Sequence, residues 1–284
     1  MKAIRYTDPM RFSERTQRFL ERNEAVNNLI LGITQNLVEK GYQDLEPYMA
    51  TVEDEETLFL VALQTPPNKL IIYGEGDLPN EAFESLASSL LQERGRLPGV
   101  VGPFEIAKRF RGIWQSKTDC KSKISMNLRV HVLTEVRYAS QITGRSRLAT
   151  EEDIATLGEW FRIFALPLNE NPSLKEATKQ AKAKIERGEV YVWEDGGLVS
   201  MAAKGRHLRN GVTIGMVYTP LEHRRGGYAT ANVAALSKEI LESGYTFCSL
   251  FTDLANPTSN SIYRKVGYKP VCDYVDYDFL TGQT

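Results

Sequence analysis

The chain has 284 residues, 42% of them hydrophobic and 25% charged, and a formal net charge of −1 at pH 7. This profile is typical of a globular protein with room for one large domain or two ordinary ones, and it gives no indication of a nucleic-acid-binding surface. Because the sequence has no apolar run suited to a signal peptide or a membrane span, and only three widely spaced cysteines, we expect a cytoplasmic protein with neither a disulfide framework nor a metal site.

The N-terminal half is predicted to alternate strands and helices. A helix is expected over residues 79–93, because Pro79 suits a first helical turn and Gly95 follows the last one. A second helix is expected through Ile106 and Trp114. The expected strands of this half are residues 3–6, 58–63, 70–73, 99–103 and 126–136.

A segment near the middle of the chain has the features expected at the start of a second domain. Residues 147–149 form a short apolar segment, and Thr150 with three acidic residues after it is typical of a helix N-terminus. Apolar residues then recur at helical spacing as far as Phe164. This predicts a boundary at about residues 141–145, which divides the chain into domains 1–142 and 143–284.

The C-terminal half is predicted to repeat the order of the first. A helix at 173–187 is followed by a strand pair joined at residues 195–197, where two glycines suit a hairpin turn. Later helices are expected at 228–242 and 258–265, and strands at 190–193, 198–203, 211–218, 247–251 and 274–279. The common order predicts a distant tandem repeat of the α/β class, although an unrelated N-terminal α/β domain remains the alternative.

An arginine- and glycine-bearing loop at residues 219–229 is the first segment that indicates a chemistry. It joins an apolar strand to a long helix and contains Arg224, Arg225, Gly226 and Gly227. The first N–H groups of a helix carry partial positive charge, and glycines let a bulky anion approach the backbone, so this loop suits a diphosphate. It matches neither a P-loop nor a dinucleotide fingerprint. On spacing alone, a glycine turn with surface arginines is the alternative.

A polar helix start at residues 253–268 is the second such segment. Asn256 is suited to an N-cap and Pro257 to the first helical position, while Gly267 ends the helix. Asn260 and Tyr263 are three residues apart and can share one face.

Together the two segments resemble the GNAT superfamily of acetyl-CoA-dependent N-acetyltransferases. That family's diphosphate motif is Arg or Gln, two residues, Gly, one residue, and Gly or Ala, which Arg224, Gly227 and Ala229 match. Its next motif, an Asn before a short helix that contains a Tyr, is matched by Asn256 and Tyr263. The resemblance covers about residues 145–284 and implies a mixed, mostly antiparallel sheet flanked by helices in each of two tandem domains.

The resemblance also implies roles for individual residues. Acetyl-CoA would be the co-substrate, with no metal, and Tyr263 would protonate the departing thiolate. Asn256 would bond the pantetheine arm, and Asn260 is a further candidate for cofactor contact. The remaining cofactor-binding candidates act through the backbone or the loop arginines: Met216, Val217, Tyr218, Arg224, Arg225, Gly226, Gly227, Tyr228 and Ala229. A buried core tyrosine is the alternative for Tyr263, and a simple helix cap for Asn256.

The base that would deprotonate the acceptor is less well indicated. Asp253 at a strand end is a candidate, and Glu222 and His223 are further ones, although a surface or capping role fits each of them. The acceptor is expected to be a small-molecule or peptide amine, and residues 160–171 are where the family often builds its acceptor pocket. A helix core is the alternative for that segment. The protein would be a monomer or homodimer, and a non-catalytic CoA-binding module or a transferase of longer acyl groups are the other functions considered.

The N-terminal domain is expected to be a degenerate copy that does not bind CoA. Where the cofactor loop would follow residues 71–73, the sequence carries Glu75 and Asp77 instead of arginines, and these carboxylates would repel a diphosphate. The domain could shape the acceptor site or stand in for a partner subunit.

Overall fold

The computed structural model describes residues 1–41, 46–168 and 170–280, which form two compact units. The first unit contains Met1–Val130 together with 252–255 and the segment that begins at Pro270. The second contains His131–Phe251 and Asn256–Lys269. None of the helices in these described ranges is both long and apolar enough to span a bilayer.

The same order of elements occurs twice along the chain, as the sequence predicted. The first series is β1 Lys2–Tyr6, α1 Pro9–Leu20, α2 Asn28–Lys40, β2 Tyr48–Asp54, β3 Thr57–Gln64, β4 Leu70–Gly74, α3 Asn80–Arg94, β5 Gly99–Pro103, α4 Phe104–Thr118 and β6 Lys121–Leu133. The second is β7 Arg145–Leu148, α5 Ile154–Ala165, α6 Leu174–Glu186, β8 Val190–Glu194, β9 Leu198–His207, β10 Gly211–Tyr218, α7 Tyr228–Glu242, β11 Phe247–Asp253, α8 Pro257–Val266 and β12 Lys269–Leu280. Strand β2 was not among the expected elements.

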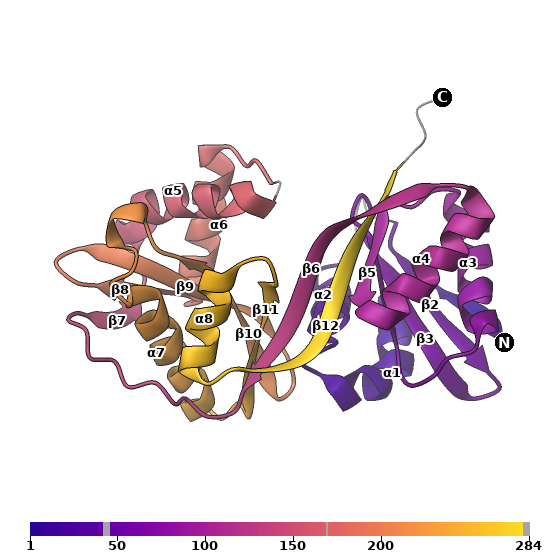
Figure 1. Cartoon of the computed structure of the whole chain (residues 1–284), viewed down its shortest axis with the longest axis horizontal. Helices are drawn as coiled ribbons and strands as arrows, with labels where there is room; N and C mark the ends of the chain where they lie inside the picture. Colours follow the sequence, from indigo (N-terminus) through magenta and orange to yellow (C-terminus); the bar gives the residue numbers. More distant parts are fainter. Residues whose placement is uncertain (42–45, 169, 281–284) are drawn as a thin grey trace. The chain divides into compact units, whose positions relative to one another are not determined.

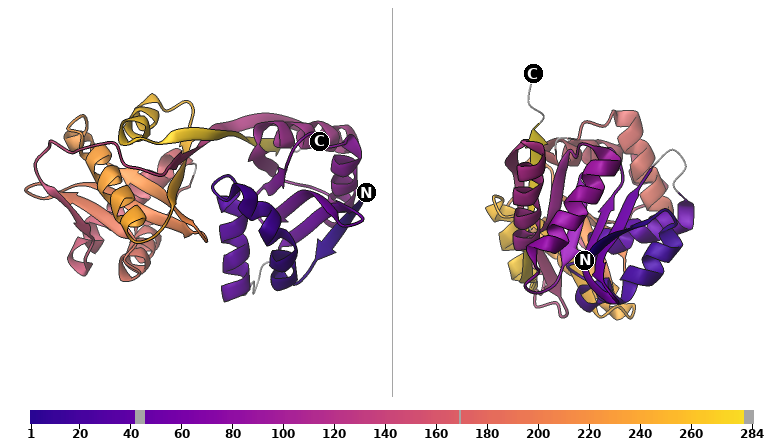
Figure 2. Two further views of the ribbon diagram at one scale, coloured as in Figure 1. Left: turned by 90° about the horizontal axis from the view of Figure 1, so that it is seen from below. Right: turned by 90° about the vertical axis from the view of Figure 1, so that its right-hand side faces the viewer.

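The sheet of the N-terminal unit has two covered faces. Its strand order is β1-β2-β3-β4-β5-β12-β6. The neighbouring pairs β1/β2, β2/β3, β3/β4 and β5/β12 are antiparallel, and the pair β4/β5 is parallel. Side chains alternate along a strand, so Tyr48 and Ala50 of β2 pack toward α3 and α4 while Met49 packs toward α1 and α2. Figure 2 shows these two helix pairs on opposite faces of the sheet.

The last strand of the chain belongs to the N-terminal unit, which differs from the predicted division into 1–142 and 143–284. Strand β12 pairs antiparallel with β5, with Tyr277 opposite Val100 (Figure 1). Val275, Tyr277 and Phe279 are buried in the core with α3 and α4. The strand lies there because its alternating apolar face completes this core.

The C-terminal unit places helices around a sheet with the order β11-β10-β9-β8-β7. Strands β10 and β11 are parallel, and the other neighbouring pairs are antiparallel. One core lies under α7 and α8, and a second lies under α5 and α6. Helix α5 begins after a capping box between Thr150 and Asp153, at the place where the sequence predicted a helix N-terminus.

Candidate active site

Strand β10 carries a bulge where the site begins. Its parallel pairing with β11 runs from Gly211 to Thr213, although β10 continues to Tyr218. Against β9, the register shifts between Gly215 and Tyr218, and Met216 adopts a positive φ of 53°. A bulge bends its strand and leaves backbone groups without ladder partners. On the side of β11, the end of β10 beyond Thr213 can therefore offer peptide groups to a bound molecule, whereas on the side of β9 Tyr218 lies opposite Met201 and its carbonyl accepts a hydrogen bond from the Ser200 hydroxyl at 3.1 Å.

The loop after β10 brings the start of α7 to the same place. Arg224 donates from Nε to the carbonyl of Thr219 at 3.0 Å, which holds the loop against the strand end. Arg225 and Gly227 have φ values of 69° and 84°, so the chain turns sharply into α7 at Tyr228. The first N–H groups of α7 have no partner within the helix and face this turn. They form a positively polarised surface suited to an anion.

The opposite wall is the first half of α8. Asn256 caps this helix by accepting a hydrogen bond from the Ser259 N–H at 3.1 Å, and Pro257 occupies the first turn. The Asn260 side chain donates to the Asn256 carbonyl at 2.8 Å. The helix ends at Gly267, which has a φ of 119°. These caps fix the helix so that one of its sides faces the loop.

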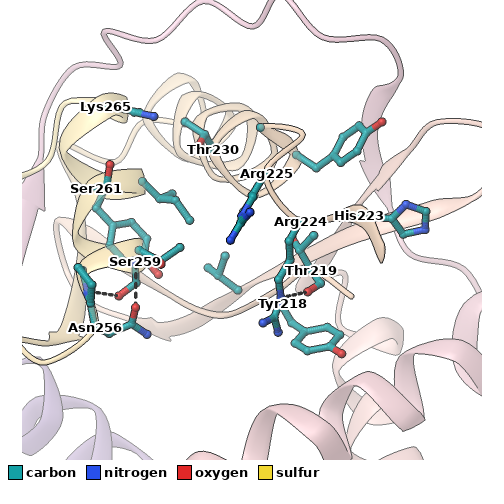
Figure 3. Close-up of a pocket in the computed structure, with 18 residues that line it drawn as sticks. Tyr218, Thr219, His223, Arg224, Arg225, Thr230, Asn256, Ser259, Ser261 and Lys265 are labelled. Carbon is teal, nitrogen blue, oxygen red and sulfur yellow. Dashed lines mark hydrogen bonds between the residues drawn. The ribbon is translucent and has the colours of Figure 1, made fainter. Parts of the chain in front are cut away.

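Between these walls lies a groove of about 810 Å³. Figure 3 shows Arg225 extending between the start of α7 and α8, with Lys265 near Thr230 at one end and Asn256 at the other. Arg224, Arg225 and Lys265 bring positive charge, and no described residue that lines the groove is acidic. The groove is lined by Val217, Tyr218, Thr219, His223, Arg224, Arg225, Gly227, Tyr228, Ala229, Thr230, Asn256, Pro257, Thr258, Ser259, Ser261, Ile262, Tyr263 and Lys265.

Tyr263 lies in the wall of this groove and is 7% exposed. Its ring packs edge-on against Tyr268 at a centroid distance of 5.8 Å. Within the described part of the chain its hydroxyl has no hydrogen-bond partner, and burial raises its pKa above the ordinary value of 10.0. The phenol is therefore protonated at neutral pH and available to an incoming group, unlike a core tyrosine whose hydroxyl is bonded within the protein.

The structure brings most of the predicted site residues together. The lining includes Val217, Tyr218, Arg224, Arg225, Gly227, Tyr228, Ala229, Asn256 and Tyr263. It does not include Met216, which packs against the core of α5 and α6, or Gly226, which lies against the Tyr228 ring. Nor does it include Asn260, because the amide of that residue is turned back toward the first turn of its own helix.

Asp253, the candidate base, is also not placed in the groove. Its carboxylate accepts the backbone N–H of Ala255 at 2.8 Å, which is the geometry of a local turn. His223 lines the groove and Glu222 does not. Trp160 and Phe161 of the expected acceptor segment are buried in the core, although the Trp160 ring packs on that of Tyr218 with a distance of 5.7 Å between the ring centroids. Residue 169 of that segment lies outside the described residues.

Sequence reasoning missed several groove residues, chiefly Lys265 and the hydroxyl residues of α8. Thr258, Ile262 and Lys265 recur at spacings of four and three residues, which places them on one helical face. That periodicity was the signal that could have found them.

Comparisons with known proteins agree with this architecture. The family described as FR47-like protein matches residues 194–275. A GNAT-family acetyltransferase from Colwellia psychrerythraea is 13% identical, with a TM-score of 0.62 over 99% of this chain and 100% of its own. A GCN5-related N-acetyltransferase from Sphaerobacter thermophilus is 12% identical, with a TM-score of 0.64 over 98% of this chain and 95% of its own. A tandem GNAT protein from the clavulanic acid biosynthesis pathway is 8% identical, with a TM-score of 0.58 over 100% of this chain and 99% of its own. No curated protein matches the sequence.

The chain therefore has the GNAT fold, present as two tandem copies whose sheets are mixed and mostly antiparallel. At these identities the solved structures establish the fold, and the chemistry of the groove depends on its own residues.

Proposed function

We propose that this protein is an N-acetyltransferase that moves an acetyl group from acetyl-CoA to a primary amine by direct attack in a ternary complex. The observation that carries the proposal is the groove beside the bulged end of β10, which is lined by the start of α7 and by the side chains of Arg224, Arg225 and Lys265. A nucleotide diphosphate with a long polar arm matches both the charge and the free peptide groups of this groove.

Each wall of the groove has a part in holding such a molecule. The amides of residues 225–229 and the Arg225 side chain bind the diphosphate, and the backbone of Val217 and Tyr218, which line the groove, pairs with the amide groups of the arm. Lys265 adds a cation near Thr230 for a further phosphate (Figure 3). Asn256 retains its cap while its NH₂ group donates to the arm.

Tyr263 is the proton donor of the proposed reaction. The acceptor nitrogen attacks the thioester carbon, the carbon–sulfur bond breaks, and the thiolate takes the hydroxyl proton of Tyr263. The acceptor amine loses its proton to a base or to a water chain, and no side chain is assigned to that step. Because burial keeps the Tyr263 pKa high, the phenol is in the required acid form at neutral pH.

The test has two stages. Calorimetry with CoA is expected to give one site per chain, because the N-terminal loop carries Glu75 and Asp77 where the arginines would lie. Arg225→Glu, which reverses one charge in the groove, should weaken that binding at least tenfold, whereas Arg22→Glu in the N-terminal unit should not. The absence of CoA binding to the unaltered protein would refute the proposal.

Release of free thiol from acetyl-CoA in the presence of an amine panel then tests catalysis. Small metabolite amines and peptide amines form separate arms, because both remain candidate acceptors. Release no faster than thioester hydrolysis with every amine would indicate a CoA-binding module instead of an enzyme. Faster release from longer acyl-CoAs would change the assignment to a different acyl group.

A further inference from the structure

The segment that joins β6 to β7, residues 134–144, contacts both helices that flank the groove; we name it the strap. At one end, the N–H of Arg137 donates to the carbonyl of Val266 at 2.8 Å. A side chain added at Gly267 would meet the Glu135 carbonyl at 3.1 Å, so the strap packs closely on the end of α8. Figure 1 shows the strap passing α8 and α7 before it reaches β7.

At its other end the strap is bonded to the start of α7 through a single carboxylate. The Thr143 hydroxyl donates to Asp195 Oδ2 at 2.8 Å, and the Tyr228 hydroxyl donates to the same oxygen at 2.8 Å. Tyr228 is the first residue of α7, so its side chain is anchored directly beside the N–H groups that face the groove. The hydroxyls of Thr143 and Tyr228 lower the pKa of Asp195, which keeps this acceptor ionised at neutral pH.

Further contacts limit the movement of the strap at this end. The Trp193 indole donates to the Thr143 carbonyl at 2.9 Å. Gly144, with a φ of 91°, lies so close to the hairpin that an added side-chain carbon would meet the Glu194 carbonyl at 2.4 Å. Ile142 packs near Gly227, the residue before α7. The carboxylate of Asp195 is thus held on a well-packed hairpin and not on a free loop.

We propose that Thr143, Asp195 and Tyr228 form a positioning cluster through which the strap fixes the first turn of α7 for anion binding. The inference rests on the proposed function, because the anion is the diphosphate of CoA. None of the three side chains touches the reacting atoms in this scheme. They lower the free energy needed to order the binding loop, so their loss should weaken the affinity for CoA and leave the rate of the chemical step unchanged.

The experiment compares Thr143→Val and Asp195→Asn with the unaltered protein. We expect the CoA dissociation constant and the KM for acetyl-CoA to rise about three- to tenfold, with kcat at saturation changed less than about twofold. Thr143→Ser retains the hydroxyl and should restore tight binding. Tyr245→Phe is the matched control, because it removes a hydroxyl that contacts His207 at 3.2 Å, outside the groove lining.

A double variant sharpens the test. Because Thr143 and Tyr228 bond the same oxygen, the losses in affinity from Thr143→Val and Tyr228→Phe should be less than additive when combined. Unchanged CoA affinity in both Thr143→Val and Asp195→Asn would overturn the proposal.

Amide hydrogen exchange separates this proposal from failure of the proposed function. If the unaltered protein does not bind CoA, the function fails, but exchange in the ligand-free variants still tests the cluster. Faster exchange confined to residues 134–144 and 228–231 in Asp195→Asn, and absent in Tyr245→Phe, supports the cluster. Exchange identical to that of the unaltered protein in those segments rejects it.

Discussion

Strands β4 and β5 of the N-terminal unit correspond to β10 and β11 of the C-terminal unit, and both pairs are parallel. The surfaces beside the two pairs nevertheless differ. In the C-terminal unit the pairing of β10 with β11 ends at Thr213, and β10 is bulged at Met216. In the N-terminal unit the register pairing of β4 with β5 also ends early, at Ile71, but β4 has no such bulge and Gly102 still lies against Ile72, since an added carbon there would lie 2.4 Å from the Ile72 carbonyl. The bulge at Met216, and not the element order alone, therefore distinguishes the strand end that borders the groove.

The loops that follow these strands differ as much as the strands do. After β4, Glu75 accepts hydrogen bonds from Tyr73 at 2.9 Å and Asn23 at 3.0 Å, so its carboxylate is held in place. Leu78 is buried against Gly74, which fills the space beside the strand end. The C-terminal loop instead presents two arginines and the start of α7. Burial of one leucine and reversal of charge together account for the different character of the N-terminal loop.

The helices α4 and α8, which hold the same place in the two series of elements, complete the comparison. Counted from the first residue of each helix, Tyr263 in α8 corresponds to Phe110 in α4, which is fully buried. Asn256, just before α8, corresponds to Pro103, which makes no side-chain cap. The N-terminal copy therefore has neither a phenol nor an amide at these two places.

Tyr263→Phe is the sharpest way to test this comparison, because it gives the C-terminal unit the residue type of the N-terminal one. We expect kcat to fall about 100-fold or more, since general acid catalysis is lost, while CoA affinity changes less than about twofold. Tyr268→Phe is the control, because its hydroxyl is bonded to Ser237 at 2.9 Å inside the core. A retained kcat in Tyr263→Phe would remove this tyrosine from the mechanism.

The pH profile provides a second measure of the same group. Burial raises the Tyr263 pKa above 10.0, and the acid form is the one that the reaction needs. Raising this pKa extends the active range upward, so ionisation of Tyr263 should cause no loss of kcat below about pH 10. An alkaline loss near pH 8 that disappears in Tyr263→Phe would contradict the pKa direction.

Gly102→Ala tests the closed strand pair of the N-terminal unit. Its added methyl group would meet the backbone of Ile72, which cannot rotate away, so we expect the free energy of unfolding to fall by about 2 kcal/mol or more. Gly215→Ala on the bulged strand is the matched variant, because no atom lies within 4 Å of its added carbon. Urea denaturation of both variants measures the difference. Equal destabilisation would show that the two strand pairs are packed alike.

The parts of the site that the sequence predicted are those with local signals. Helix α8 begins and ends at residues whose caps act within one turn, namely Asn256 with Pro257 and Gly267. Similarly, Gly227 marks a turn that needs a positive φ. The bulge at Met216 has no such signal, because positive φ at a methionine is imposed by the surrounding sheet.

The placement of β12 could not be predicted for a related reason. Its alternation of apolar residues specifies a half-buried strand but not the sheet it joins, and its partner β5 is far away in sequence. The position of Asp253 at a strand end and the helical spacing of Asn260 suggest the two candidates, but neither feature shows that each side chain bonds its own local backbone. Strand β2 is buried along both faces and so lacks the clear alternation of a half-exposed strand.

Lys265→Met gives the smallest expected effect and tests the charged end of the groove. The corresponding residue of α4, again counted from the helix start, is Gly112, so this position carries a cation only in the C-terminal copy. If Lys265 contacts a phosphate, the variant should bind CoA about three- to tenfold more weakly, with the loss reduced in high salt. Its affinity for dephospho-CoA should be unchanged, because that molecule lacks the ribose phosphate but keeps the diphosphate. An equal loss for both molecules would place Lys265 at the diphosphate, and no loss for either would leave the arginine loop and α7 as the source of anion binding.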